Sequence, residues 1–130
     1  MIKTLASSLY SLYIECVKFF ENATVHIQKE EYEIGKQYIP CDLKVNIFDK
    51  ELTFCENIKV LKIAGHSKGS CIIEIESNSI TYVIEGDECY LRECITNRIS
   101  TGCSIDPEAS LGFVNKYSNK KYQILLCHDN

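Results

Sequence analysis

The apolar residues at the start of the chain recur at intervals of three and four. Leu5, Leu9, Leu12, Cys16 and Phe20 follow this spacing, while serines and charged residues fall largely between them. A period near 3.6 residues places such side chains on one face of a helix. The pattern therefore predicts an amphipathic helix over residues 2–22.

After residue 22 the apolar period changes to two, which is typical of strands with one buried face. Val25 and Ile27 alternate with polar neighbours. Two longer alternating segments are each interrupted by turn-forming residues, 43–54 around Asp49-Lys50 and 70–85 around residues 77–79. We expect both to be antiparallel hairpins, with a further strand over residues 58–64 between them.

The last third of the chain is less regular. Residues 87–98 fit a short helix capped by Asp87, although a strand fits nearly as well. Residues 102–112 are expected to be a loop, because a residue before proline is displaced from the helical region and Asp106 precedes Pro107. Segments 113–117 and 122–127 predict a final hairpin. The whole pattern predicts one α+β domain over residues 1–130, with the N-terminal amphipathic helix packed on an antiparallel β-meander of about seven strands.

Charge and hydropathy narrow the choice of partners. The 130 residues contain 14 Lys and Arg against 18 Asp and Glu, a formal charge of -4. Binding to a nucleic acid requires many cationic phosphate contacts, so we expect no nucleic-acid partner. We also expect no membrane association, because no apolar stretch approaches the ~18 residues of a membrane span. The first residues lack the composition of a secretory signal.

Eight cysteines are spread over the chain without any C-x-x-C pair. Most stand beside β-branched or aromatic residues, where a free thiol packs as a small hydrophobic group. This distribution predicts a reduced protein in the cytoplasm. The alternative is an exported chain in which the cysteines form disulfides.

The segment Gly65-His66-Ser67-Lys68-Gly69 matches G-x-S-x-G, the pattern that surrounds the nucleophilic serine of α/β-hydrolases. That serine must be followed by a helix, whereas the residues after Gly69 alternate as a strand does. We therefore interpret the segment as a tight turn between strands.

Cys127-His128-Asp129 contains the three residue types of a thiol hydrolase. Adjacent side chains on an extended segment point to opposite faces, whereas a catalytic triad is assembled from separate segments. We expect a structural or exposed role for these residues.

A zinc site could draw on Cys89, Cys94 and Cys103 with His66 or His128, because zinc accepts three cysteines and one histidine. The cysteine spacing does not match a zinc knuckle, so core packing is the simpler interpretation and no metal or other cofactor is predicted.

Acidic residues gather at 30–33 and again where the strand near residue 84 ends. Without a recognisable catalytic constellation, the sequence favours a binding protein over an enzyme. Small acidic α+β proteins of this kind include immunity proteins, which neutralise a toxin stoichiometrically. We therefore predict a cytoplasmic inhibitor of a basic partner, such as a toxin or nuclease domain. The contact residues expected on its surface, with the tyrosine as anchor, are Glu85, Asp87, Glu88, Tyr90 and Glu93.

Two other functions stay open at this point. The protein could bind or sequester a small ligand, and a homodimer could form if residues 25–28 or the final strand lie at a sheet edge. An enzyme that uses Ser67 or a thiol is the least favoured reading.

Overall fold

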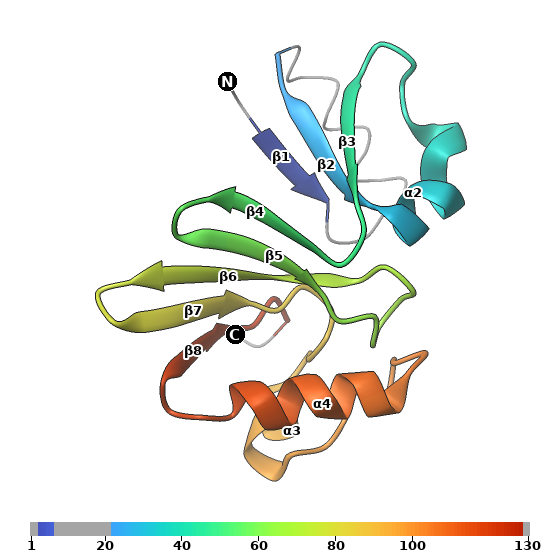
Figure 1. Ribbon diagram of the computed structural model, residues 1–130. Coiled ribbons are helices and arrows are strands. Elements are labelled where there is room, and N and C mark those ends of the chain that lie inside the picture. Colours follow the sequence, from blue (N-terminus) through green and yellow to red (C-terminus); the bar gives the residue numbers. More distant parts are fainter. Residues whose placement is uncertain (1–2, 7–21, 129–130) are drawn as a thin grey trace.

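The strands form two sheets rather than one meander (Figure 1). The computed structural model describes residues 3–6 and 22–128. The first sheet has the order β1 (Lys3–Ala6), β2 (Thr24–Gln28) and β3 (Lys44–Phe48), and both pairings are parallel. The second has the order β4 (Glu51–Cys55), β5 (Ile58–Lys62), β6 (Cys71–Ser77), β7 (Ile80–Ile84) and β8 (Tyr122–Leu125). Strands β4 to β7 are antiparallel neighbours, whereas β8 joins β7 in parallel.

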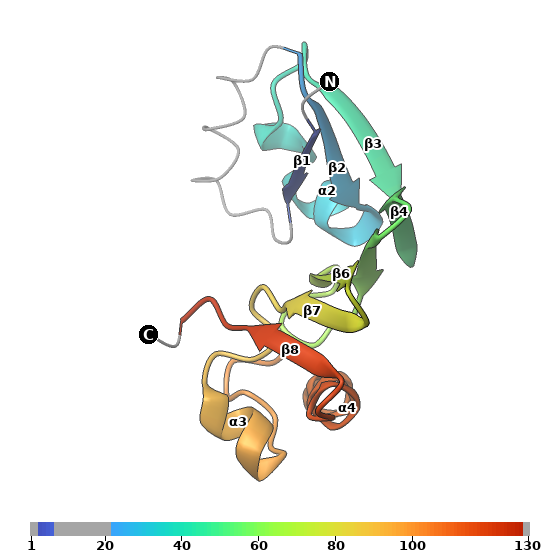
Figure 2. The ribbon, with the colours of Figure 1, turned by 90° about the vertical axis from the view of Figure 1, so that its left-hand side faces the viewer.

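Helices and a short 3-10 turn connect these strands. Helix α2 (Lys29–Gly35) follows β2 directly and continues into the 3-10 turn η1 (Lys36–Tyr38). Helices α3 (Arg92–Asn97) and α4 (Pro107–Tyr117) lie between β7 and β8 in the chain. Figures 1 and 2 both place α3 and α4 at the β8 end of the molecule and α2 beside the three-stranded sheet. The crossover through α3 and α4 is what allows β8 to run parallel to β7.

The main hydrophobic core lies between the five-stranded sheet and α4. One side of the helix contributes Phe113, Val114 and Tyr117, which pack with Ile72 of β6 and Val83 of β7. These residues are almost completely buried. Smaller clusters lie around Val25 and Ile27 and around Phe48 and Val60.

The hairpin predicted over residues 70–85 is confirmed. Strands β6 and β7 pair in antiparallel register, with Ile75 opposite Tyr82 and Ile73 opposite Ile84. Asn78 and Ser79 form the connection with φ angles of 49° and 67°. Two consecutive positive φ values are typical of the tight turns that match the twist of a hairpin, and asparagine tolerates them well. The strand predicted over residues 58–64 is also present, as β5.

The predicted fold class, an N-terminal helix on an antiparallel meander, is wrong. Residues 3–6 inside the predicted helix form strand β1, and three of the six strand pairings are parallel. The remainder of the predicted helix, residues 7–21, lies outside the described residues. Alternation along a strand reports which face is buried but not the direction of its neighbour.

The predicted loop over residues 102–112 overlaps helix α4. The Oδ1 atom of Asp106 accepts hydrogen bonds from the N–H groups of Glu108 at 3.1 Å and Ala109 at 3.0 Å. Pro107 occupies the first turn, where its missing N–H has no consequence. The pair that suggested a loop is therefore a helix start. Segment 113–117 continues that helix, so the predicted final hairpin is wrong.

The predicted hairpin over residues 43–54 is also wrong, because β3 and β4 belong to different sheets. Strand β2 lies between β1 and β3, so residues 25–28 are not at a sheet edge. Strand β8 is an edge strand of the larger sheet. Among the described residues, no helix is long and apolar enough to cross a membrane.

Candidate functional site

The turn that follows β7 carries most of the polar residues singled out in the sequence. Glu85 is the first residue after β7, and Gly86 reverses the backbone with a φ of 63°, a conformation that glycine adopts without strain. Asp87, Glu88 and Tyr90 follow before the chain enters α3. We call residues 85–90 the β7 turn.

Glu85 is fully buried and joins the β7 turn to the segment that follows β8. Its Oε1 atom accepts a hydrogen bond from the N–H of Cys127, and its Oε2 atom accepts one from the N–H of Cys89, each at 2.9 Å. Its exposed fraction is 0%. Burial raises the pKa of Glu85 to about 7, although the two N–H donors oppose this effect.

Glu88 is buried to the same degree and joins the β7 turn to the loop between β5 and β6. Its Oε1 atom accepts hydrogen bonds from the N–H of Gly65 at 3.3 Å and from the hydroxyl of Ser70. A Cβ atom on residue 65 would lie 2.3 Å from Oε2 of Glu88, so this approach requires glycine. Burial raises the pKa of Glu88, and the hydrogen bonds to Ser70 and to the backbone of His66 and Gly65 counteract it.

A third buried glutamate, Glu31 of α2, holds the other end of that loop. Its Oε1 atom accepts hydrogen bonds from the N–H of Gly69 at 3.0 Å and from the hydroxyl of Ser67. A Cβ atom on residue 69 would lie 2.6 Å from Cγ of Glu31. Both glycines of the G-x-S-x-G segment are thus explained by close contact with buried glutamates.

Two histidines contact the β7 turn, one from a segment earlier in the sequence and one from a segment later in it. The hydroxyl of Tyr90 lies 3.4 Å from Nδ1 of His66. The ring of Tyr90 lies edge-on to the ring of His128, with centroids 4.6 Å apart. The Nε2 atom of His128 lies 3.2 Å from Oδ1 of Asp87. We call His66, Asp87, Tyr90 and His128 the histidine–tyrosine cluster.

The cluster can exchange protons and is accessible to solvent. The side chain of His128 is 53% exposed and that of Asp87 is 25% exposed. An imidazole beside a carboxylate is a suitable general base, because the carboxylate stabilises the cation that forms. A phenol hydroxyl can donate a hydrogen bond to a substrate oxygen.

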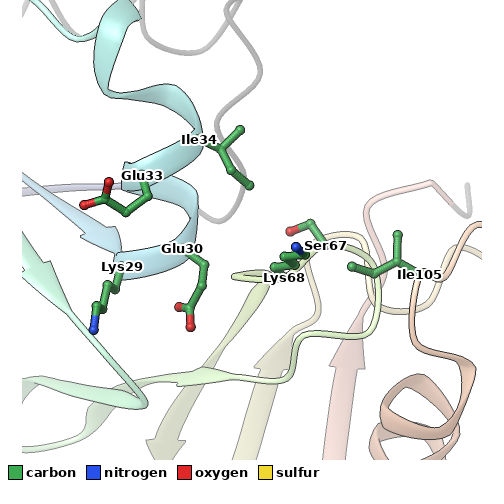
Figure 3. Close-up of a pocket in the computed structure, with 7 residues that line it drawn as sticks. All are labelled: Lys29, Glu30, Glu33, Ile34, Ser67, Lys68 and Ile105. Atoms are coloured by element: carbon green, nitrogen blue, oxygen red, sulfur yellow. The ribbon is translucent and has the colours of Figure 1, made fainter.

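An open cavity of about 510 Å³ lies beside the loop that carries His66. Figure 3 shows residues of α2 on one side and Ser67, Lys68 and Ile105 on the other. Ile34 and Ile105, which line the cavity, are 58% and 60% exposed. A cavity of this size could hold part of a small ligand.

Two of the five residues predicted to contact a partner are not at the surface. Glu85 and Glu88 are fully buried, and backbone N–H groups satisfy their carboxyl oxygens, so neither side chain can contact a protein partner. Glu93 is exposed in the first turn of α3. Asp87 and Tyr90 are partly exposed and belong to the histidine–tyrosine cluster.

The other residues considered in the sequence as nucleophiles or metal ligands lie apart from one another or make structural contacts. Ser67 donates its hydroxyl to Glu31 and is not placed as a nucleophile. Cys89 and Cys94 are buried in the main core, whereas Cys103 is exposed in a loop. Asp129 lies outside the described residues.

Sequence reasoning missed the pairing of His66 and His128 across Tyr90. Each histidine was considered only with its neighbours in sequence, inside a turn motif and a three-residue run. The available signal was the position of each at the end of a segment that leaves the sheet, which is where binding and catalytic groups tend to gather.

Comparison with solved structures identifies the fold. An N-acyl homoserine lactone hydrolase with the product N-hexanoyl-L-homoserine bound at its catalytic metal center matches with a TM-score of 0.81 and 22% identity. The match covers 99% of this chain and 56% of that chain. A probable metal-dependent hydrolase from Staphylococcus aureus matches with a TM-score of 0.68 and 26% identity, over 85% of this chain and 46% of that one. A protein from Thermotoga maritima, provisionally named a metallo-beta-lactamase, matches with a TM-score of 0.67 and 16% identity, over 99% and 67% of the two chains.

The chain therefore has the fold of metallo-beta-lactamase hydrolases over the part that it spans, and it spans little more than half the length of the lactonase structure. No protein-family model matches the sequence, and no curated protein matches it. The structural matches overturn the prediction of a non-enzymatic immunity protein with a basic toxin as partner, because the proteins that share this fold are metal-dependent hydrolases.

The described residues do not fit a metal centre of the kind named for these hydrolases. Residues 3–6 and 22–128 contain no group of three or more histidine, cysteine, aspartate or glutamate side chains that could hold an ion. In the histidine–tyrosine cluster the ring of Tyr90 contacts both imidazoles, and Asp87 already binds His128. The third histidine, His26, lies in the other sheet, beside Asn46. A catalytic zinc ion needs about three protein ligands at one point.

Proposed function

We propose that this chain is the site-bearing part of a hydrolase that cleaves a small ester or lactone, with the histidine–tyrosine cluster as its acid–base centre. The observation that carries the proposal is the contact of His128 with both Asp87 and Tyr90, while the Tyr90 hydroxyl faces His66. The shared fold of lactone-cleaving and other hydrolases supports it.

The reaction needs one water molecule. His128 removes a proton from this water as its oxygen attacks the carbonyl carbon of the substrate, and Asp87 stabilises the resulting imidazolium. The Tyr90 hydroxyl donates a hydrogen bond to the carbonyl oxygen, where negative charge develops. The carbon–oxygen bond of the ester then breaks, and the imidazolium of His128 returns its proton to the leaving oxygen. The products are one carboxylic acid and one alcohol, which remain in one molecule when the substrate is a lactone.

The open cavity suggests what the substrate carries besides the ester. Ile34 and Ile105 would contact an apolar substituent, and Lys68 stands beside them on the loop next to His66. A short acyl or alkyl chain would bury these two side chains, at roughly 25 cal/mol per Å² of apolar surface. We therefore expect substrates with an apolar chain to be cleaved faster than short ones.

The spread of the cysteines along the chain predicts a reducing compartment. A cytoplasmic location is part of the proposal.

The test is hydrolysis of a panel of esters and lactones, followed by base consumption at constant pH. We expect Tyr90→Phe to lower kcat by about tenfold or more, because one donor to the developing oxyanion is removed. Tyr38→Phe is the matched control, since Tyr38 is exposed in η1 and lies outside the cluster. If the unmodified chain hydrolyses nothing above the buffer rate, or if both variants keep full activity, the proposal is wrong.

A further inference from the structure

His128 reaches Tyr90 on a segment that lies beyond the last strand of its sheet. His128 follows β8 by three positions, and the last residue of that strand is Leu125. Its side chain is more than half exposed, and Cys127 is exposed as well. Packing alone therefore does not determine where the imidazole lies.

The carboxyl group of Glu85 constrains the backbone beside this imidazole, in addition to the contact of the imidazole with Asp87. One of its oxygens binds the N–H of Cys127, the residue before His128, and the other binds the N–H of Cys89, the residue before Tyr90. A single buried group thus connects the backbone next to each of the two rings that contact one another. Each of these hydrogen bonds is 2.9 Å long, and the side chain that accepts both is fully buried.

Glu88 constrains the backbone next to His66, as Glu85 constrains the backbone next to His128. Glu88 binds the N–H of Gly65, the residue before His66, and the hydroxyl of Ser70. The two glutamates lie three positions apart in the β7 turn, yet they hold different loops. This separation allows one histidine to be released while the other stays in place.

We infer that Glu85 is a positioning residue that holds His128 against Tyr90, and that Glu88 does the same for His66. Glu85 touches no reacting group and acts through the backbone of Cys127 and Cys89. The inference gives a role to buried acids that the hydrolytic step does not use. Its link to catalysis rests on the proposed function, but the placement of the rings does not.

NMR spectra of the full chain test the inference without any substrate. The chain has three histidines, so the ring signals of His26, His66 and His128 can be assigned separately. In the unmodified chain, we expect the His128 ring protons to show nuclear Overhauser contacts with Tyr90 and chemical shifts displaced by its ring. In Glu85→Gln, where an amide N–H₂ faces one of the two N–H donors, these contacts should disappear and the shifts should return toward unfolded values. His26 signals should not move, because this residue lies in the other sheet.

Glu88→Gln is the matched control, since it makes the same chemical change three positions away. We expect it to displace the His66 signals and leave the contact between His128 and Tyr90 intact. Loss of chemical-shift dispersion in the His26 signals would show that Glu85→Gln prevents folding. In that case, Cys127→Pro is used to test the inference. Proline lacks both an N–H and a thiol, so this variant removes the hydrogen bonds of residue 127 to Glu85 and keeps the carboxyl group.

The inference is wrong if the contact between His128 and Tyr90 persists in Glu85→Gln. If Glu85→Gln is unfolded, the same result in Cys127→Pro overturns it. Equal displacement of both histidines by either glutamine variant also overturns it, because the two glutamates would then act only on general stability. Hydrolysis is measured separately. An inactive chain with the expected spectra would refute the proposed function alone, and an active chain with unchanged spectra would refute the positioning role alone.

Discussion

The Nε2 atom of His128 lies 3.2 Å from Oδ1 of Asp87, although the two residues are 41 positions apart in the sequence. Strand β8 runs parallel to β7, so the segments that leave the two strands emerge at the same end of the sheet. This topology, rather than any local motif, brings the carboxylate to the imidazole.

Asp87→Asn should lower the rate of hydrolysis by about 10²-fold or more, because an amide cannot stabilise the imidazolium that forms on His128. The change preserves size, so the free energy of unfolding should shift by only about 1 kcal/mol. Initial rates at several pH values measure the effect. Asp49→Asn, in the exposed turn between β3 and β4, is the control and should retain full activity. Equal rates for the two variants would argue against a role for Asp87.

The stability of the fold should depend on the protonation of Glu85. Burial raises the pKa of Glu85 to about 7 from an ordinary value of 4.5, so the folded state favours the protonated acid. Its contribution is therefore fully present below about pH 4.5 and is lost as the pH rises through about 7. A shift of this size corresponds to about 3 kcal/mol. Urea unfolding at pH 5 and pH 7.5 measures the difference in the free energy of unfolding between the two pH values. This difference should be smaller in Glu85→Gln. An unchanged difference in that variant would show that other groups cause the pH dependence.

Gly69→Ala should destabilise the protein, because a Cβ atom there would lie 2.2 Å from Oε1 of Gln28 and 2.9 Å from the backbone nitrogen of Glu31. Overpacking of this kind typically lowers the free energy of unfolding by about 1–3 kcal/mol. Gly112→Ala is the matched control. Nothing lies within 4 Å of its added Cβ, and alanine is favoured over glycine inside α4 by about 0.5–1 kcal/mol. Thermal unfolding should therefore shift in opposite directions, and a parallel shift would contradict the close packing at Gly69.

Thiol alkylation should separate the described cysteines into two classes. Cys41, Cys55 and Cys103 are exposed and should react first in the folded protein. Cys71 and Cys89 should react only on unfolding, because burial raises the pKa of both thiols to about 12 and also blocks access. Peptide mass spectrometry after brief treatment with iodoacetamide measures the rates. Early modification of Cys71 would show that the fold opens around β6.

Local patterns predicted the parts of the fold that depend on neighbouring residues. Alternating isoleucines and the Asn78-Ser79 turn were sufficient for the hairpin of β6 and β7. Asp106-Pro107 was ambiguous, because the same pair can end an extended segment or begin a helix. The decisive signal lay further on, in the spacing of Phe113, Val114 and Tyr117, which places them on one face of α4.

The site depended on relationships that local patterns do not contain. The direction of β8 relative to β7 determines whether His128 can meet Asp87, and alternation does not report direction. The burial of Glu85 and Glu88 was equally hidden, since an acidic run normally indicates a solvated surface. The same residues were noticed in the sequence for their charge, but the structure uses two of them as acceptors for backbone N–H groups.

The parallel pairing of β7 with β8 also affects the order of folding. Helices α3 and α4 lie between β7 and β8 in the chain, so pairing β8 with β7 closes a long loop and loses chain entropy. The antiparallel strands β4 to β7 involve shorter loops and can assemble sooner. A refolding intermediate with these four strands paired would expose the β7 edge and hold His66 near Tyr90, while His128 would still be far from Asp87. Recovery of the cluster should therefore coincide with the slowest phase of refolding, and aggregation through the open β7 edge should compete with it until then.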